Sequence, residues 1–204
     1  METRLERTKQ ALSKHGFDVR LVASAAEAKQ AVLAEIEAGQ KVGIGGSRTI
    51  DTLDLVPELE AKGCELFWHW QAETPAEADR LKKAQLTADV FLASSNAVTE
   101  DGCLVNIDGT GNRVAAMTFG PGKVILVCGQ NKVVSDVAAG IERIETVAAP
   151  LNARRLNTGT PCGITGSCND CDSPNRMCSV TSIIKRRPKL TDLKVILVKE
   201  ELGY

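Results

Sequence analysis

Short apolar runs alternate along the chain with segments whose apolar residues recur at helical spacing. The pattern predicts strands at 17–22, 41–44, 64–70, 90–93, 103–107, 124–128 and 193–198. It predicts helices at 2–14, 24–38, 74–86 and 133–144, and shorter helical stretches after residue 49, before residue 119 and at 150–156. Strands that alternate with helices are typical of a largely parallel sheet covered on both faces.

A tight turn adds one antiparallel pair to this picture. Thr99-Glu100-Asp101-Gly102 has hairpin chemistry and is expected to join the strand at 90–93 to the strand at 103–107. The predicted fold is therefore a single Rossmann-like α/β domain over residues 1–204, with a mostly parallel sheet plus a hairpin. A cysteine-rich loop at 157–181 belongs to this domain.

Composition excludes some classes of partner. The 204 residues include 25 basic and 26 acidic side chains, so no strong field gathers nucleic acid or an anionic membrane. No apolar run is long enough to span a bilayer, and the first residues lack the apolar core of a signal peptide. We therefore expect a cytoplasmic protein.

The strand at 41–44 runs directly into a glycine turn with hydroxyl side chains. At the carboxyl end of a parallel strand, such a turn directs backbone N–H groups and a helix dipole towards a bound anion. A tight turn without a ligand is the alternative, because the motif has neither the G-x-G-x-x-G pattern nor the lysine of a P-loop. The candidate binding residues here are Gly45, Gly46, Ser47, Arg48 and Thr49.

A second polar segment, Ser94 to Arg113, lies around strand ends where ligands of α/β proteins bind. Glu100 and Arg113 are its candidate catalytic residues, because turn chemistry does not require either; a glutamate in a turn is otherwise a solvent-facing residue. With only two histidines, a Ser-His-Asp or Cys-His device is not expected. The candidate binding residues of this segment are Asn96, Asn106, Asp108, Thr110, Gly111 and Asn112.

Four cysteines fall within a loop rich in glycine and short polar residues, PCGITGSCNDCDSPNRMCSV. Cys162, Cys168, Cys171 and Cys178 have the spacing C-x5-C-x2-C-x6-C. In a reducing cytosol such a cluster favours metal binding over disulfides. An iron–sulfur cluster, a structural zinc ion and a regulatory dithiol all remain open, and the single C-x2-C pair favours the cluster over zinc.

Three blocks together resemble the lactate-utilisation (LUD) domain family: GIGGSRT, SSNAVTEDGCLVNIDGTGNRVAAMTFGPGKVILVCGQNKVV and TPCGITGSCNDCDSPNRMC. The resemblance covers nearly the whole chain. It implies a fold like that of the ribose-5-phosphate isomerase, glucosamine-phosphate deaminase and CoA-transferase group, in which GIGGSRT resembles the first turn that contacts phosphate or CoA. Members of this family occur in systems that oxidise L-lactate to pyruvate, where partner proteins carry iron–sulfur clusters.

These observations lead to two functional hypotheses. The first is a redox-associated protein that binds a small anionic metabolite or cofactor in an α/β pocket. Its four cysteines hold a cluster of the [4Fe-4S] type for electron transfer with an iron–sulfur or flavin partner protein. The second is a non-redox isomerase or CoA-transferase-like enzyme, or an assembly module, with a structural zinc site.

Overall fold

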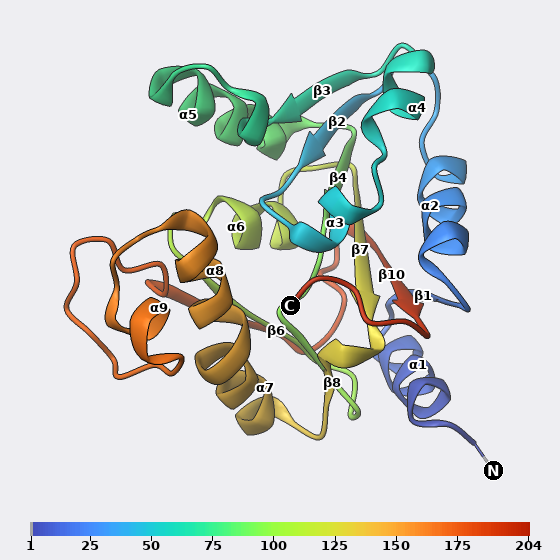
Figure 1. Ribbon diagram of the computed structural model, residues 1–204. Helices are drawn as coiled ribbons and strands as arrows, with labels where there is room; N and C mark the ends of the chain where they lie inside the picture. Colours follow the sequence, from blue (N-terminus) through green and yellow to red (C-terminus); the bar gives the residue numbers. More distant parts are fainter. Residues whose placement is uncertain (1) are drawn as a thin grey trace.

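A six-stranded parallel sheet forms the centre of the computed structural model, which describes residues 2–204 (Figure 1). The strand order is β1-β10-β7-β4-β2-β3, and every neighbouring pair is parallel. Its strands are β1 (Asp18–Val22), β2 (Lys41–Ile44), β3 (Glu65–Trp68), β4 (Val90–Ala93), β7 (Lys123–Gly129) and β10 (Asp192–Val198). The α/β fold class predicted from the sequence is confirmed.

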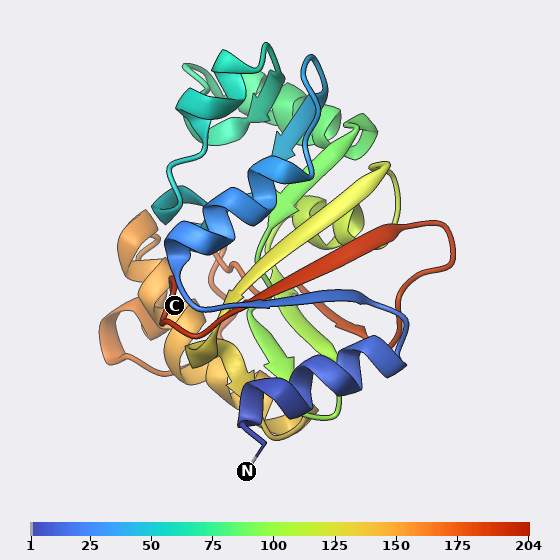
Figure 2. The same cartoon turned by 90° about the vertical axis from the view of Figure 1, so that its right-hand side faces the viewer.

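Both faces of this sheet are buried, as β7 shows. Ile125 and Val127 pack on the face covered by α2 (Ala25–Ala34), α3 (Arg48–Thr52) and α4 (Val56–Ala61). Val124, Leu126 and Cys128 pack on the opposite face, which contacts α1 (Arg4–Lys14), α6 (Asn112–Thr118) and a second sheet. Because each face has its own core, the strand is continuously apolar from Val124 to Cys128 rather than apolar at alternate positions. Figure 2 shows α2 lying across one face of the sheet.

The second sheet has the order β8-β5-β6-β9, with β5 (Ala97–Thr99), β6 (Leu104–Asp108), β8 (Val133–Val134) and β9 (Val180–Ile184). The hairpin at Glu100 exists, but it joins β5 to β6, with Ala97 opposite Val105. The prediction that it joins the strand at 90–93 was wrong, because β4 belongs to the large sheet. Strand β9, which the sequence pattern did not predict, pairs antiparallel with β6.

The remaining helices are α5 (Pro75–Ala84), α7 (Val137–Arg143), α8 (Ala149–Leu156) and α9 (Pro161–Thr165). The predicted helix at 133–144 is in fact β8 followed by α7, which begins at the side-chain cap of Asp136. A π-helical turn then continues α7 directly into α8. The cysteine segment is not loop throughout, because Pro161 begins the short helix α9.

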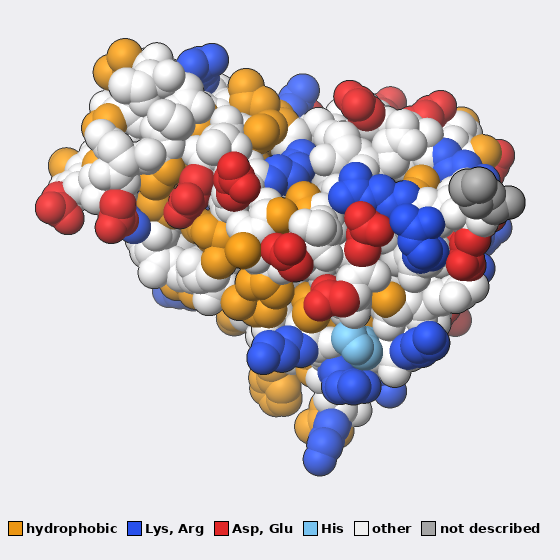
Figure 3. Space-filling view, turned by 90° about the horizontal axis from the view of Figure 1, so that it is seen from below, with side chains coloured by type: hydrophobic (Ala, Val, Ile, Leu, Met, Phe, Trp, Pro, Cys, Tyr) orange, Lys and Arg blue, Asp and Glu red, His pale blue; other side chains and the backbone are white. Residues whose placement is uncertain are grey.

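The surface agrees with the balanced composition. Figure 3 shows acidic, basic and hydrophobic side chains interspersed over the face seen from below. Within residues 2–204, no helix has the length and apolar character needed to cross a membrane.

Candidate functional site

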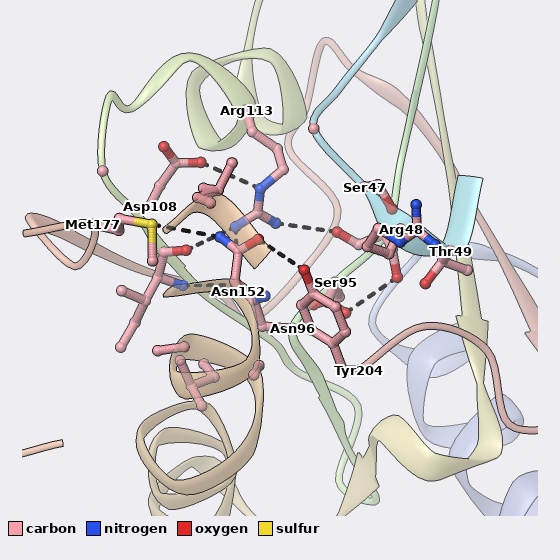
Figure 4. A pocket seen from close by; sticks show the side chains of 18 of the residues that line it. Ser47, Arg48, Thr49, Ser95, Asn96, Asp108, Arg113, Asn152, Met177 and Tyr204 are labelled. Carbon is pink, nitrogen blue, oxygen red and sulfur yellow. Dashed lines mark hydrogen bonds and ion pairs between the residues drawn. The ribbon is translucent and has the colours of Figure 1, made fainter. Parts of the chain in front are cut away.

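A cavity of about 240 Å³ opens at the carboxyl ends of the parallel strands. Strands β2, β4 and β7 are neighbours, so the segments that follow them meet at one edge of the sheet. The wall opposite comes from α8 and from the cysteine segment (Figure 4). The polar and charged side chains that line the cavity are Ser47, Arg48, Thr49, His69, Ser94, Ser95, Asn96, Asp108, Thr110, Asn112, Arg113, Lys132, Asn152 and Tyr204.

Lys132 is a buried cation of this cavity. It follows β7, and only 4% of the residue is exposed. Its Nζ donates to Thr49 Oγ1 at 2.9 Å and to Ser94 Oγ at 3.0 Å. Among residues 2–204 no carboxylate forms an ion pair with it. Burial lowers the pKa of Lys132 from 10.5 to about 8, since a charged amine is costly away from water.

Arg113 is also buried, but all of its hydrogen-bonding capacity is used. A guanidinium has five N–H donors. Nη1 donates to Ser94 O and Asn106 Oδ1, and Nη2 donates to Asn96 Oδ1 and Ile107 O. Nε pairs with Asp108 Oδ2 at 3.2 Å. Arg113 therefore has no N–H left for a ligand, and its contacts hold the loop after β4 against strand β6.

The side-chain oxygens that accept from Arg113 also accept hydrogen bonds from backbone N–H groups. Asn106 Oδ1 also accepts the backbone N–H of Asn96, and Asn96 Oδ1 accepts that of Ile107. Asp108 Oδ1 accepts the N–H groups of Thr110 and Gly111, which shapes the turn into α6. Asn96, Asp108, Thr110 and Asn112 line the cavity, whereas Asn106 and Gly111 lie behind its wall.

The glycine turn after β2 lies at the cavity over most of its length. Gly46, Ser47, Arg48 and Thr49 line it, while Gly45 donates its N–H to Leu92 O and lies outside it. Ser47 caps α3 through the backbone N–H of Ile50. Arg48 pairs with Asp51 and remains about half exposed, so its guanidinium is accessible to a ligand.

Glu100 lies apart from this cluster. It does not line the cavity, and its carboxylate pairs with Arg4 at 2.6 Å and Arg7 at 3.4 Å on α1. This location gives no support to the hypothesis that Glu100 acts as a base or nucleophile in the pocket.

His69 directs a neutral imidazole towards the glycine turn. The Gln85 side-chain amide is fixed by donation from Nε2 to Ile44 O and Phe67 O, and the same nitrogen lies 3.2 Å from His69 Nδ1. Because an amide nitrogen cannot accept a hydrogen bond, a proton on Nδ1 would have no acceptor there, so the neutral ring carries its proton on Nε2. Burial lowers the pKa of His69, in agreement with a neutral ring. His69 therefore offers the cavity an N–H donor.

The cysteine segment forms part of the cavity wall. Met177, next to Cys178, lines the cavity, and its sulfur accepts from Asn152 Nδ2 at 3.7 Å. Its backbone lies so close to Gly109 that a Cβ there would be 3.1 Å from Met177 Cα. The N–H of Ser179 donates to Asp108 O at 3.0 Å, where β9 begins to pair with β6. This pairing explains why the segment reaches the pocket.

The four cysteines of the segment are free and partly exposed. Burial raises the pKa of Cys178, nearby Arg176 opposes that rise, and Cys168 and Cys171 add to it through their proximity. Cys162 lies on α9, where its sulfur is 3.4 Å from Thr160 Oγ1. Within residues 2–204, however, no three Cys, His, Asp or Glu side chains are grouped closely enough to hold a metal ion.

Several cavity residues were missed by the sequence argument. Lys132 had a signal, because it closely follows the apolar strand at 124–128, but the sequence pattern did not single it out. His69 was interpreted as a packing residue between two tryptophans. Asn152, Met177 and Tyr204 have no local signal, because only the tertiary fold brings α8, the cysteine segment and the last residues together.

The fold and site define an α/β protein with a polar cavity at the carboxyl ends of its parallel strands. The chain belongs to the LUD domain family, whose sequence model matches residues 5–198. No curated protein matches it.

Two solved structures are similar. A DUF162 family protein from Deinococcus radiodurans has 16% identity and a TM-score of 0.54, covering 97% of this chain and 99% of that chain. This likeness shows the fold alone. Ribose 5-phosphate isomerase from Plasmodium falciparum has 14% identity and a TM-score of 0.37, covering 54% of this chain and 52% of that chain. A likeness at that level carries no argument about function.

Proposed function

We propose that this protein binds a small carboxylate or phosphate anion in the cavity and holds an iron–sulfur cluster on the adjacent cysteine segment. Membership of the LUD domain family suggests a function related to lactate utilisation, which makes small hydroxy and oxo acids the first ligands to test. The observation that carries the proposal is that one cavity contains both the buried cation Lys132 and Met177 of the cysteine segment.

The anion site follows from charge and hydrogen bonding. Lys132 has two neutral acceptors and no carboxylate partner among residues 2–204, so a bound anion would compensate its buried charge. Arg48 and the Nε2–H of His69 lie at the same cavity and supply further donors. The cavity is small, so a metabolite of few atoms fits it better than a polymer.

The donor chemistry of the cysteine segment suits a cluster. Cys162, Cys168, Cys171 and Cys178 are free thiols on a partly exposed segment, and thiolates are the ligands that iron–sulfur clusters prefer. Such a site orders around its metal, because binding and local folding are coupled. A bound cluster supplies electron transfer, and an iron–sulfur or flavin protein is the partner class we propose.

Anaerobic purification with iron and sulfide tests the redox half of the proposal. We expect a brown protein containing iron and acid-labile sulfide, whose visible absorption is bleached by dithionite. Cys171→Ser should lose that absorption, while the matched control Cys64→Ser should keep it. A colourless protein with stoichiometric zinc would contradict the cluster and support the zinc alternative.

The anion half is tested by thermal shift and calorimetry with pyruvate, L-lactate, phosphate and acetyl-CoA. A ligand that binds only the folded state raises the midpoint of unfolding. We expect at least one small anion to bind wild type and to bind Lys132→Met at least tenfold more weakly. If none of these anions binds, the proposal of an anion site is contradicted, whatever metal the protein contains.

A further inference from the structure

The two hydroxyls that contact Lys132 each have another acceptor for their own hydrogen, so they act as acceptors towards Lys132. The Thr49 hydroxyl donates its own hydrogen to Leu202 O at 3.2 Å. The Ser94 hydroxyl donates to Ser95 O at 3.2 Å. Lys132 must therefore give one N–H to each of them, at 2.9 and 3.0 Å.

This arrangement fixes the third position on the Lys132 nitrogen. An ammonium has three N–H bonds, whereas a neutral amine has two N–H bonds and a lone pair. With two N–H bonds donated to Thr49 and Ser94, the remaining position has no partner among residues 2–204. In the neutral amine, this position is the lone pair, and the residue that carries it lines the cavity.

We propose that Lys132 is a nucleophile that forms an imine with the carbonyl group of a small 2-oxo carboxylate bound in the cavity. The inference rests on the anion site proposed above and adds the class of ligand: a carboxylate next to a carbonyl carbon. A buried lysine can serve as a Schiff-base residue, because burial favours the neutral, nucleophilic amine. The pKa of about 8 leaves a useful neutral fraction near neutral pH.

The step balances without any further reactant. The amine nitrogen attacks the carbonyl carbon, the C–N bond forms, and one amine proton passes to the former carbonyl oxygen. The carbinolamine then loses that hydroxyl with the second amine proton as water, leaving the imine. No oxidant or reductant takes part. Arg48 and the Nε2–H of His69 are the donors available for the carboxylate, since the N–H groups of Arg113 are all occupied.

Reductive trapping tests the proposal. Full-length protein is incubated with pyruvate and cyanoborohydride, and its intact mass and peptides are then measured. We expect one addition per chain, equal in mass to pyruvic acid less one oxygen atom, located on Lys132. L-Lactate is the matched control ligand, because it has a hydroxyl where pyruvate has the carbonyl, and it should add nothing.

Lys132→Arg separates covalent reaction from binding. It keeps the positive charge but has no primary amine, so it should bind pyruvate in calorimetry without being labelled. If that variant does not fold, the location of the label in the peptides of the wild-type protein is the deciding result. Pyruvate that binds wild type without labelling Lys132, or that labels other lysines equally, overturns the imine and leaves the anion site standing. If pyruvate, glyoxylate and 2-oxobutyrate all fail to bind, the imine is ruled out, and the anion site then stands only if L-lactate or phosphate binds.

Discussion

The side-chain amide of Asn152 on α8 donates to the sulfur of Met177 at 3.7 Å, while its oxygen accepts the hydroxyl of Tyr204 at 2.8 Å. One asparagine thus ties the cysteine segment to α8 and to the last residue of the chain. Asn152 and Met177 line the side of the cavity opposite the glycine turn, whereas Tyr204 follows Gly203, which lies against Thr49 of that turn (Figure 4). A shift in the backbone of the cysteine segment is therefore expected to alter the affinity of the cavity for its ligand.

Gly109→Ala tests whether the cysteine segment shapes the cavity. Its added Cβ would lie 3.1 Å from Met177 Cα and 3.3 Å from Met177 O, so the backbone of the segment must shift. We expect anion affinity to fall severalfold, while the unfolding midpoint changes little because Gly109 lies on an exposed turn. Unchanged affinity measured by calorimetry would show that the segment does not shape the site.

Glu100→Gln should leave ligand binding intact. The carboxylate pairs with Arg4 and Arg7 on the surface of α1 rather than with the cavity. Losing these partly exposed pairs should lower the free energy of unfolding by about 0–1 kcal/mol, measured by urea denaturation. A large loss of anion affinity would restore Glu100 as a functional residue.

Substitution of Arg113 should lower the free energy of unfolding, whereas substitution of Arg48 should weaken anion binding. Arg113→Ala leaves Asp108 buried without its partner, so we expect a loss of about 3–5 kcal/mol in unfolding free energy. Arg48→Ala removes a half-exposed side chain and should cost about 0.5 kcal/mol or less while weakening anion binding. Denaturation and calorimetry on both variants check the contrast. The reverse pattern would mean that Arg113, not Arg48, serves the ligand.

The lowered pKa of Lys132 predicts two pH effects. Anion affinity should fall as pH rises through about 8, because the ammonium loses its charge there. Between pH 8 and 10.5 the unfolded chain binds more protons at this lysine than the folded chain, so Lys132 makes the free energy of unfolding rise with pH. The rise is about 3 kcal/mol at most. Lys132→Met should abolish both effects, and a wild-type profile that the variant reproduces would contradict the assignment.

Much of the fold was predictable because helix-capping motifs and the apolar pattern of the strands agree with the tertiary structure. Ser24 and Thr74 cap their helices, as the glutamate three residues after each of them indicates. The apolar strands of the parallel sheet are buried on both faces, and that burial makes them easy to recognise. Strand β9 escaped prediction because four of its five residues remain at least partly exposed, so no regular burial pattern marks it.

The candidate site was only partly predictable, because the order of the strands in the sheet brings together residues that are far apart in the chain. Lys132 contacts Ser94 and Thr49, which are 38 and 83 residues away in the chain. Its position just after the apolar strand at 124–128 is its one local signal, and lysines are otherwise seldom buried. The structure brings many of the polar residues after the strand ends to one cavity. Which of them are free to bind a ligand, however, depends on hydrogen bonds that only the structure reveals, as Arg113 shows.

We propose that the cysteine segment that holds the cluster forms part of the wall of the anion site, and electron paramagnetic resonance tests this relation most directly. Anaerobically loaded, reduced protein is titrated with an anion that calorimetry has shown to bind. We predict a change in the cluster signal that saturates with the calorimetric affinity and is lost in Lys132→Met. A cluster signal that stays unchanged when the anion site is saturated would contradict the claim.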